Sequence, residues 1–569
     1  MSSTADDVQA KPTDIFDLIV IGAGINGAGI ARDAAARGLR VALVEREDIG
    51  SGTSNYSGRL VHGGLRYLEQ GDVRLVRESL REREKLFKLA PHLVKPVSLM
   101  MPFYSHNRRS SRAVRAAMIA YDVLSFDKSV GTHTVLSREK TLERNPGMNA
   151  DGLTGSAIFY DGQVVWSERM CVEVVLAAHA DGCKVYTYAE VDGLITEGQT
   201  VRGVRFTDRL TGERHALGGR VIVNAAGPWV DAVLASDKRI TQRFIGGTKG
   251  SHLVVRPFAG APKDVVYYES HKDGRLVLVI PWGDQFLIGT TDQRFDGNLD
   301  TVRADAGEVE YLLGEVNRLI PGANLDDSDV LYTYSGVRPL PFVPGKSEWN
   351  VSRSHIIKDH APEHRRLLSI IGGKLTTYRS LAEETVDAVY KQLGLKPKRC
   401  ITTELLYPGA HVQDWDAFRA DLAETTSLPQ ATIDRLVSVY GSRATEIIAL
   451  GRAEPALLQP LGNSGDAIGA ELVFTYCHEF ARTLTDVLLR RTMIGHREGG
   501  GVDLASRCAD ILAPHAGWDE ARCKREVADY TRYVERFAKP GDLPGDLPGN
   551  LSGSLAGGAE PSTQSANAA

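Results

Sequence analysis

Several features that would narrow the function are scarce or missing in this 569-residue chain. Its six cysteines are scattered with no C-x-x-C pair, which argues against a zinc ribbon, an iron–sulfur site or a disulfide framework, so no metal site is expected. Reduced thiols fit a cytoplasmic compartment. No run of eighteen apolar residues occurs and the N-terminus is polar, so neither a transmembrane span nor a signal peptide is expected.

Positive charge is also not in excess. The formal net charge is −5, and a nucleic-acid-binding face needs a concentrated positive field, so we expect no nucleic-acid partner. The composition, 43% hydrophobic and 24% charged, is typical of a soluble globular protein. The length predicts about three or four domains.

The most informative segment that is present runs from Asp17 to Glu45. It reads as a buried β-strand, a G-x-G-x-x-G turn, an alanine-rich helix, a second strand and a terminal acid. In such a unit the first glycine permits a tight turn, the second lets the backbone approach a pyrophosphate, and the third allows close packing of helix on strand. The acid accepts hydrogen bonds from a ribose. The unit predicts ADP binding through Gly22, Gly24, Gly27 and Glu45.

A second segment favours a flavin over a nicotinamide at the other end of that ADP. Ser51 to Tyr67 reads S-G-T-S-N-Y-S-G-R-L-V-H-G-G-L-R-Y, a dense set of hydroxyls and glycines directly after the ADP unit. Hydroxyls can hold a pyrophosphate, and glycine pairs let the backbone lie flat against a large ring. The cofactor-lining candidates in this loop are Ser54, Ser57, His62 and Gly63.

Two later segments bring the chain back to the cofactor. Arg220 to Trp229 is a strand that ends in small residues, among them Gly227. Ile371 to Arg379 has a glycine pair followed by a helix start, which offers N–H groups and a positive dipole end to the negative edge of a reduced flavin. Its cofactor candidates are Gly373, Lys374, Leu375 and Thr376.

Positive groups in glycine- or aromatic-rich segments indicate an anionic substrate, because arginine offers a rigid donor fork to phosphate or carboxylate. These groups are Arg66, Lys249, Arg338, Arg353 and Lys374. His62 and His252 are the candidates for proton handling.

The element pattern predicts an α/β, Rossmann-like FAD-binding domain, an antiparallel-sheet substrate or cap domain, and a C-terminal all-α domain. Helices are expected at 72–89, 431–440, 443–450 and 471–491. The expected ranges are a flexible lead-in (1–14), three parts of the FAD-binding domain (15–105, 161–248, 358–395), a cap segment with possible membrane contact (106–160), the substrate domain (249–357), the helical domain (396–540) and a disordered tail (541–569).

These pieces, in this order, resemble the FAD-dependent glycerol-3-phosphate dehydrogenases, a branch of the D-amino-acid-oxidase-like flavoproteins. The resemblance covers about residues 15 to 540. The residues that carry it are Gly22–Gly29, His62–Tyr67 (H-G-G-L-R-Y), Lys249–His252 (K-G-S-H), Gly289–Asp292 (G-T-T-D), Tyr334–Leu340 (Y-S-G-V-R-P-L) and Gly372–Arg379 (G-G-K-L-T-T-Y-R).

The resemblance implies non-covalent FAD, oxidation of sn-glycerol 3-phosphate at C2 to dihydroxyacetone phosphate with hydride transfer to flavin N5, and electron transfer to a membrane quinone. It also implies a possible homodimer. By matching motifs, Arg338 and Lys374 lie nearest the reacting carbon, and His252 is the candidate base. Arg66, Tyr67 and Arg353 are substrate-binding candidates, and the stretch around Arg353 is the least like the family pattern.

Electron transfer to a membrane quinone requires contact with a bilayer, and this contact has to be made without a transmembrane helix. The segment 107–126 starts with Arg108, Arg109, Arg112 and Arg115 and continues with apolar residues, as in a helix that lies in the plane of an anionic membrane. An ordinary cap-domain helix is the alternative. We expect a peripheral enzyme on the cytoplasmic face of the membrane.

Three other functions stay open at this point. A glycerol-3-phosphate oxidase would use the same pocket and reduce oxygen to hydrogen peroxide. An amino-acid oxidase of the wider family would need one carboxylate-binding arginine rather than several positive groups. A non-catalytic flavin-binding sensor would bind FAD without reducing it.

Overall fold

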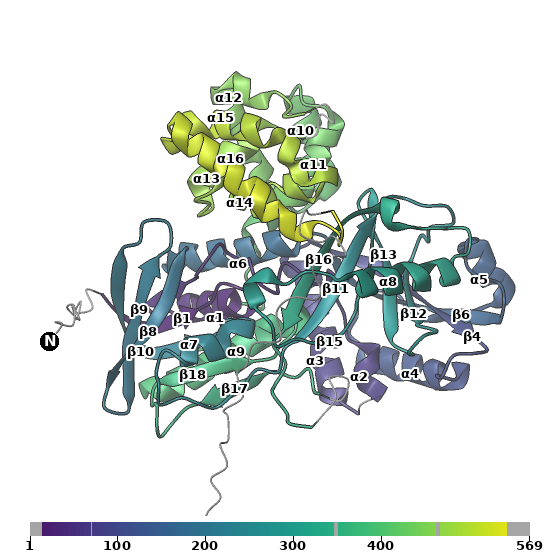
Figure 1. Cartoon of the computed structure of the whole chain (residues 1–569), viewed down its shortest axis with the longest axis horizontal. Helices are drawn as coiled ribbons and strands as arrows, with labels where there is room; N and C mark the ends of the chain where they lie inside the picture. The colour runs from purple at the N-terminus through teal and green to yellow at the C-terminus, as the bar shows by residue number, and fades with distance from the viewer. Residues whose placement is uncertain (1–13, 70, 346–350, 463–466, 543–569) are drawn as a thin grey trace, which may run out of the picture.

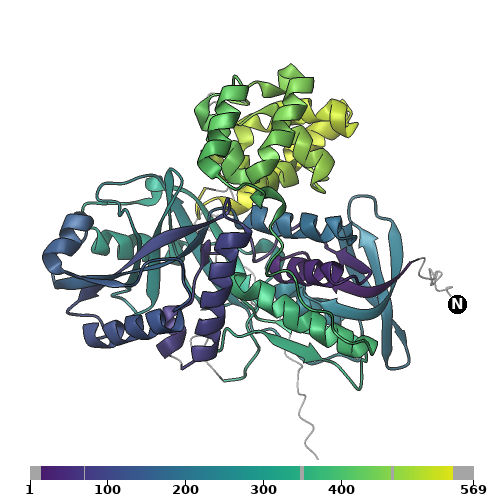
Figure 2. The ribbon, with the colours of Figure 1, turned by 180° about the vertical axis from the view of Figure 1, so that it is seen from behind.

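The protein, seen here as a computed structural model, is described for residues 14–69, 71–345, 351–462 and 467–542, apart from the Arg66 side chain. The expected lead-in and tail fall almost wholly outside these ranges. Two sheet-containing lobes lie side by side, and a helical lobe sits on top of both (Figure 1). The reverse view shows the same three parts (Figure 2).

The first lobe is built on an eight-stranded sheet with β1 in its interior, as the ADP unit predicts. β1 pairs in parallel with β2 on one side and with β10 on the other. The sheet consists of β17 (Ile356–Asp359), β18 (Leu367–Ile371), β10 (Arg214–Asn224), β1 (Ile15–Ile21), β2 (Val41–Val44) and β7 (Lys184–Tyr186) in that order, with β9 (Thr200–Asp208) on β10 and β8 (Ala189–Glu197) on β9.

Helices cover the first sheet and start at the edge where its parallel strands end. α1 (Ile25–Ala36) follows β1 directly and packs between α6 (Ser167–Ala180) and α9 (Tyr378–Leu393). The short α7 (Val230–Leu234) follows β10. Parallel β-branched strands buried on both faces explain the near-continuous apolar runs in this part of the sequence.

The second lobe contains a ten-stranded, mostly antiparallel sheet, as expected for the substrate domain. β3 and β4 belong to this sheet although they fall inside the range 15–105. The strands run β15 (Gln293–Arg294), β11 (Thr248–Val255), β14 (Gln285–Gly289), β13 (Leu276–Trp282), β12 (Val265–Glu269), β4 (Val94–Tyr104), β6 (Leu153–Val164) and β3 (Leu60–Val61), with β16 (Val330–Arg338) on β11 and β5 (Thr134–Ser137) on β6.

Five helices pack around this second sheet. The expected helix at 72–89 is α3, which Asp72 caps by accepting a hydrogen bond from the Leu75 N–H. The others are α2 (Leu65–Glu69), α4 (Ser111–Leu124), α5 (Arg138–Arg144) and α8 (Ala306–Leu319), and α3 spans Val73–Leu89.

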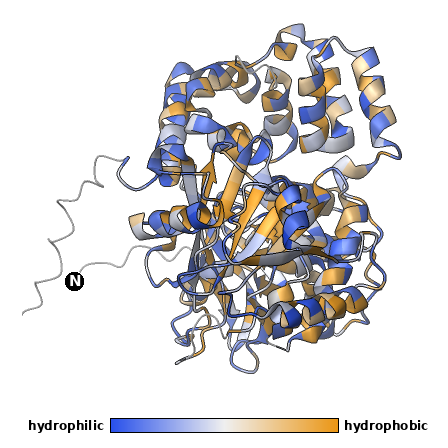
Figure 3. Ribbon diagram, turned by 90° about the vertical axis from the view of Figure 1, so that its right-hand side faces the viewer, coloured by the Kyte–Doolittle hydropathy of each residue, from blue (hydrophilic) through white to orange (hydrophobic). Residues whose placement is uncertain are grey.

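The helical lobe begins after residue 400 and has its own apolar core. In Figure 3 its helices alternate between hydrophobic and hydrophilic bands, whereas strands near the centre of the view are largely hydrophobic. Its helices are α10 (Trp415–Thr425), α11 (Gln430–Tyr440), α12 (Ala444–Ala453), α13 (Gly469–His478), α14 (Leu484–Asp486), α15 (Ala505–Ala516) and α16 (Glu520–Val534).

One helix expectation in this lobe is wrong. The single helix expected over 471–491 is broken after His478 because Phe480 adopts a left-handed conformation (φ 60°) and Thr483 caps a new helical start. The helix resumes at Leu484 and widens into a π-helical turn at Val487–Arg491.

Among the helices of the described residues, none has the length and apolar character that a bilayer crossing requires. All six cysteines are free.

Buried ion pairs join the helical lobe to the first lobe. Asp48, at the start of the cofactor loop, accepts hydrogen bonds from Arg490 Nε (2.6 Å) and from both Arg491 Nη atoms (2.7 and 2.9 Å). Glu479 pairs in the same way with Arg169 of α6. The charged side chains of both clusters are almost fully buried. The helical lobe therefore fixes the loop that follows the ADP unit.

Replacing Asp48 with asparagine is expected to lower the free energy of unfolding by about 3–5 kcal/mol, because it removes the buried carboxylate that pairs with Arg491 and that shares Arg490 with Asp486. Burial raises the pKa of Asp48, but Arg491 and Arg490 outweigh it and hold the pKa below 3.8. The stabilisation is therefore complete above the unfolded pKa and is lost as the pH falls through the lowered one. Urea unfolding of the variant and wild type, repeated from neutral pH into the acid range, measures both effects.

Asp529→Asn is the matched control, since Asp529 is exposed and pairs with Arg532 on the same helix. A loss of stability no larger than that of the control would contradict the assigned role of Asp48.

Candidate active site

A cavity of about 330 Å³ runs along the carboxyl ends of β1, β2 and β10. It starts beside the residues that follow β2 and ends at the turn between β18 and α9. Most of the expected cofactor residues line it, namely Gly22, Gly24, Glu45, Ser54, Ser57, Gly227, Gly373, Lys374 and Leu375. The cavity joins segments that lie more than three hundred residues apart in the chain.

The glycines of the ADP unit fit a nucleotide cradle. Gly22 has φ 100°, and a Cβ there would lie 2.7 Å from the carbonyl oxygen of Ala225. A Cβ on Gly27 would lie 1.8 Å from the carbonyl oxygen of Gly22, so only glycine permits α1 to start this close to β1. Gly24 is the N-cap of α1, and Ile25 and Asn26 of the first turn line the cavity, where the Ile25 N–H donates to Ser54 Oγ (2.9 Å). These features fit the pyrophosphate of FAD.

Two acceptors complete the cradle. The Glu45 carboxylate accepts hydrogen bonds from the N–H groups of Ala23 (2.7 Å) and Glu47 (2.9 Å) and still has free lone pairs for ribose hydroxyls. Burial raises the pKa of Glu45 to about 7. The side-chain oxygen of Asn26, at the start of α1, is buried without a partner among the described residues. An unpaired buried acceptor beside the cavity is consistent with a ligand that donates to it.

A second cavity of about 320 Å³ lies between the two sheets and shares Gly372, Gly373, Lys374 and Leu375 with the first. One end of the cofactor cavity is therefore a wall of the second cavity. The candidates His62, Tyr67, His252, Arg338, Arg353, Lys374 and Thr376 all line this second cavity. Arg66 lies on α2, but its side chain is outside the described part of the chain.

The structure brings together two of the predicted arginines through a carboxylate. Asp292 Oδ1 lies 3.2 Å from Arg338 Nη1, and Asp292 Oδ2 lies 3.1 Å from Arg353 Nη2. Arg338 also donates to the hydroxyl of Thr290 (3.0 Å). Asp292 holds the two guanidinium forks side by side in the lining of the second cavity. Guanidinium forks of this kind suit a phosphate group.

Lys374 marks the point where the two cavities meet. Its ammonium donates to Ser79 Oγ (2.9 Å) and to the His62 carbonyl oxygen (3.3 Å), and it lies 4.5 Å from the centre of the Tyr67 ring. Burial lowers the pKa of Lys374, while Tyr67 and Asp161 act in the opposite direction. Lys374 is therefore part of the lining of both cavities.

The two candidate histidines are held neutral. Burial, with a smaller effect of Arg338, lowers the pKa of His252 to about 3, and burial with Lys374 lowers the pKa of His62 to about 3. The His252 ring stacks on Tyr334 with the ring centres 4.9 Å apart. Nδ1 of His252 is buried without a partner among the described residues. A neutral imidazole can accept a proton, and an anionic substrate beside it would raise its basicity.

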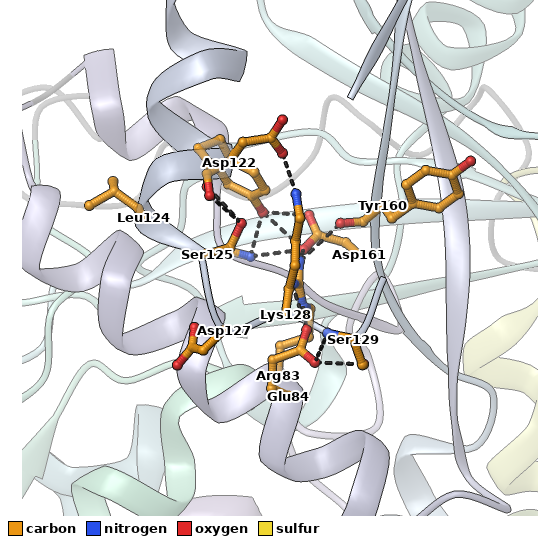
Figure 4. A network of polar contacts seen from close by, with 12 residues as sticks. Arg83, Glu84, Asp122, Leu124, Ser125, Asp127, Lys128, Ser129, Tyr160 and Asp161 are labelled. Atoms are coloured by element: carbon orange, nitrogen blue, oxygen red, sulfur yellow. Dashed lines mark hydrogen bonds and ion pairs between the residues drawn. The ribbon is translucent and has the colours of Figure 1, made fainter. Parts of the chain in front are cut away.

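Asp161, which lines the second cavity, belongs to a polar network that the sequence reasoning missed (Figure 4). Asp161 accepts hydrogen bonds from Arg83 Nη1 (2.6 Å) and from the Tyr121 hydroxyl (2.7 Å). The Gly63 N–H donates to that same hydroxyl (2.9 Å), and a Cβ on Gly63 would collide with it. Gly63 therefore packs against Tyr121, which fixes the adjoining His62 at the cavity. Lys249, another of the predicted positive groups, forms ion pairs with Asp305 and Glu308.

Comparison with known proteins agrees with this arrangement. The model of the FAD dependent oxidoreductase family matches residues 17–379, and that of the C-terminal domain of alpha-glycerophosphate oxidase matches 400–523. A glycerol-3-phosphate dehydrogenase of Synechocystis is 42% identical over 538 residues, covering 92% of this chain and 97% of that protein. An aerobic glycerol-3-phosphate dehydrogenase of Staphylococcus saprophyticus is 34% identical, covering 84% of this chain and 86% of its own.

A solved structure, the glycerol-3-phosphate dehydrogenase from Bacillus halodurans complexed with FAD, has a TM-score of 0.74 at 27% identity and covers 92% of this chain and 95% of its own. Fold and cofactor cavity together define an FAD-dependent oxidoreductase. Within that class, the chain belongs to the FAD-dependent glycerol-3-phosphate dehydrogenase family. The expected fold class and cofactor are confirmed.

Proposed function

We propose that this enzyme oxidises sn-glycerol 3-phosphate at C2 to dihydroxyacetone phosphate and passes the electrons to a membrane quinone at the cytoplasmic face of the bilayer. The observation that carries the substrate assignment is the cluster of Arg338, Arg353 and Asp292, which lines the same cavity as Lys374. A phosphate at the two arginines leaves the short glycerol carbon chain to extend toward the cofactor. Bound FAD supplies the acceptor for the C2 hydride.

The side chains of the cavity then have separate tasks. Arg338 and Arg353 bind the phosphate, and Asp292 keeps their forks aligned. His252 accepts the hydroxyl proton at its neutral ring, and Lys374 stabilises negative charge where the two cavities meet. Leucine and phenylalanine side chains on the opposite wall exclude water and strengthen these charge interactions, among them Leu60, Leu99 and Phe159.

The proposed membrane contact rests on the outer face of α4 and the residues just after it. Arg112 and Arg115 are exposed there, and Ile119, Val123 and Phe126 are 57%, 65% and 78% exposed. The opposite face of α4 is buried in the core of the second lobe. Basic side chains followed by an outward apolar stripe suit the interface of an anionic membrane.

Not all four arginines of this segment are available to lipid headgroups. Arg109 is ion-paired with Glu69 and Glu269. Replacing Arg112 and Arg115 with serine is therefore expected to weaken binding to anionic liposomes by roughly 30-fold, since each basic residue near such a surface contributes about 1 kcal/mol. Co-sedimentation with phosphatidylserine-containing vesicles measures this.

The matched control replaces Arg399 and Arg532, which are exposed elsewhere, with serine and so makes the same change in net charge. Equal liposome binding by the α4 variant and this control would refute the proposed surface.

The electron acceptor is tested by turnover with glycerol 3-phosphate in the presence of a short-chain quinone analogue and, separately, with oxygen alone. We expect rapid turnover with the quinone and little hydrogen peroxide with oxygen. Peroxide formation at the quinone-supported rate would identify the enzyme as an oxidase instead.

A further inference from the structure

The helical lobe extends beyond its last long helix and returns to the body of the protein. After α16, residues 535–540 run from the lobe to the second sheet, where the yellow end of the chain lies beside β16 (Figure 1). There the Ala538 carbonyl oxygen accepts hydrogen bonds from Arg303 (3.4 Å) and Thr333 (3.5 Å), and Lys539 donates to the Asp327 carbonyl oxygen (2.6 Å). This segment is therefore anchored at both ends.

Where it crosses between the lobes, the segment reaches the cofactor cavity. Arg536 is among the residues that line that cavity, together with Thr53, Tyr56 and Trp229 of the first lobe. Its neighbour Phe537 is 8% exposed and packs with its ring centre 6.3 Å from that of Tyr56. A residue of the C-terminal lobe thus forms part of a wall that otherwise belongs to the FAD-binding fold.

The position of Arg536 is firmly set. Its guanidinium carbon lies 3.6 Å from the centre of the Tyr533 ring, and the Tyr533 hydroxyl accepts a hydrogen bond from Arg490 (3.4 Å). Arg490 in turn donates a hydrogen bond to Asp48, three residues before the Ser51–Tyr67 loop that carries the cofactor candidates. The same lobe therefore fixes the cofactor loop at Asp48 and presents Arg536 to the cavity beside Tyr56.

Arg536 retains unused donor capacity. Its Nε is buried and has no partner among the described residues. Of the carboxylates that line the cavity, Glu47 helps to raise the pKa of Arg536 and itself pairs with Arg46 and Arg209, while Asp300 pairs with Arg46. A guanidinium fork with a buried unpaired N–H fits an anionic acceptor, and the pyrophosphate is the anionic part of FAD.

We propose that Arg536 is a cofactor-binding residue, and that the C-terminal helical lobe serves to retain FAD by presenting this guanidinium to the pyrophosphate. The proposal depends on the FAD site but not on the substrate or on the electron acceptor.

The test measures FAD release from the purified holoenzyme by the recovery of free-flavin fluorescence. Arg536→Gln is expected to release FAD at least about tenfold faster than wild type, because a charged hydrogen bond contributes on the order of tenfold or more. The increase in Tm that FAD gives to the apoprotein should shrink, while the Tm of the apoprotein itself stays close to that of wild type. Arg536→Lys keeps the charge and should restore part of the retention.

Arg532→Gln is the matched control, because Arg532 lies one turn earlier, is 71% exposed on its side chain and pairs with the exposed Asp529. It should release FAD at the wild-type rate. Release from Arg536→Gln at that same rate would overturn the proposal. So would faster release that is matched by an equal fall in apoprotein Tm and is not relieved by Arg536→Lys, because packing alone would then explain the effect.

Discussion

Replacing Arg338 with alanine is expected to lower kcat/KM for glycerol 3-phosphate by about two to four orders of magnitude while FAD stays bound. The variant loses the fork that faces the substrate phosphate, and charged hydrogen bonds contribute roughly 1.5–3 kcal/mol each. A bidentate contact therefore accounts for about 3–6 kcal/mol, at 1.4 kcal/mol per tenfold. Anaerobic stopped-flow reduction of the flavin, followed at several substrate concentrations, measures the loss.

Two comparison variants make this result specific. Arg338→Lys keeps the positive charge but not the fork, so its activity should lie between those of wild type and the alanine variant. Arg256→Ala removes an arginine just beyond β11, whose side chain is 47% exposed and pairs with Glu498, and should leave flavin reduction unchanged. Normal reduction by Arg338→Ala would refute the proposed phosphate site.

Replacing Lys374 with methionine is the second large effect. We expect flavin reduction to slow by about 10²–10³, because one buried positive charge about 4 Å from a developing negative charge contributes on the order of 4 kcal/mol at an effective dielectric constant of 20. The same charge stabilises the reduced flavin, so the two-electron reduction potential should fall by tens of millivolts, at about 30 mV per 1.4 kcal/mol. Equilibration with a reference dye measures the potential.

Lys391→Met provides the control, since Lys391 is exposed in the last turn of α9, the helix that follows the Lys374 turn. Its flavin should keep the wild-type potential and reduction rate. A Lys374→Met enzyme with an unchanged potential would show that the ammonium group does not act on the flavin.

The cofactor site could be predicted from the sequence because its signals are local. Gly22, Gly24 and Gly27 follow one strand, Glu45 ends the next, and their tasks are set by backbone geometry that only those residue types permit. The boundary of the second domain was harder to predict than the cofactor site. β4 reads as an apolar strand, but its pairing with β6, some fifty residues away, is a long-range choice that periodicity does not encode.

The residues that line the second cavity could be predicted only in part. Arg338, Arg353 and Lys374 stood out because each lies in a segment rich in glycine or aromatic residues. The carboxylate that joins the two arginines, Asp292, did not, although it ends the G-T-T-D motif, because its role appears only when three distant segments meet. Tyr121 was hidden for a different reason, since its helix reads as a surface element and its hydroxyl faces inward to Asp161.

The role of the helical lobe was beyond sequence reasoning altogether. Asp48 and Arg491 are separated by 443 positions, and nothing near either residue indicates the other. The break at Phe480 was missed for lack of a glycine or proline, the usual signals of a helix end. Both features depend on tertiary contacts that fix the lobe against the cofactor loop.

The most direct test of the proposed function is to mix the purified holoenzyme with sn-glycerol 3-phosphate in the absence of oxygen and to follow the visible absorbance of the flavin. The site described here predicts rapid and complete bleaching, which a quinone analogue then reverses. A flavin that stays oxidised under these conditions, in a protein with a full complement of FAD, would contradict it and would favour a flavin-binding protein without this catalytic activity.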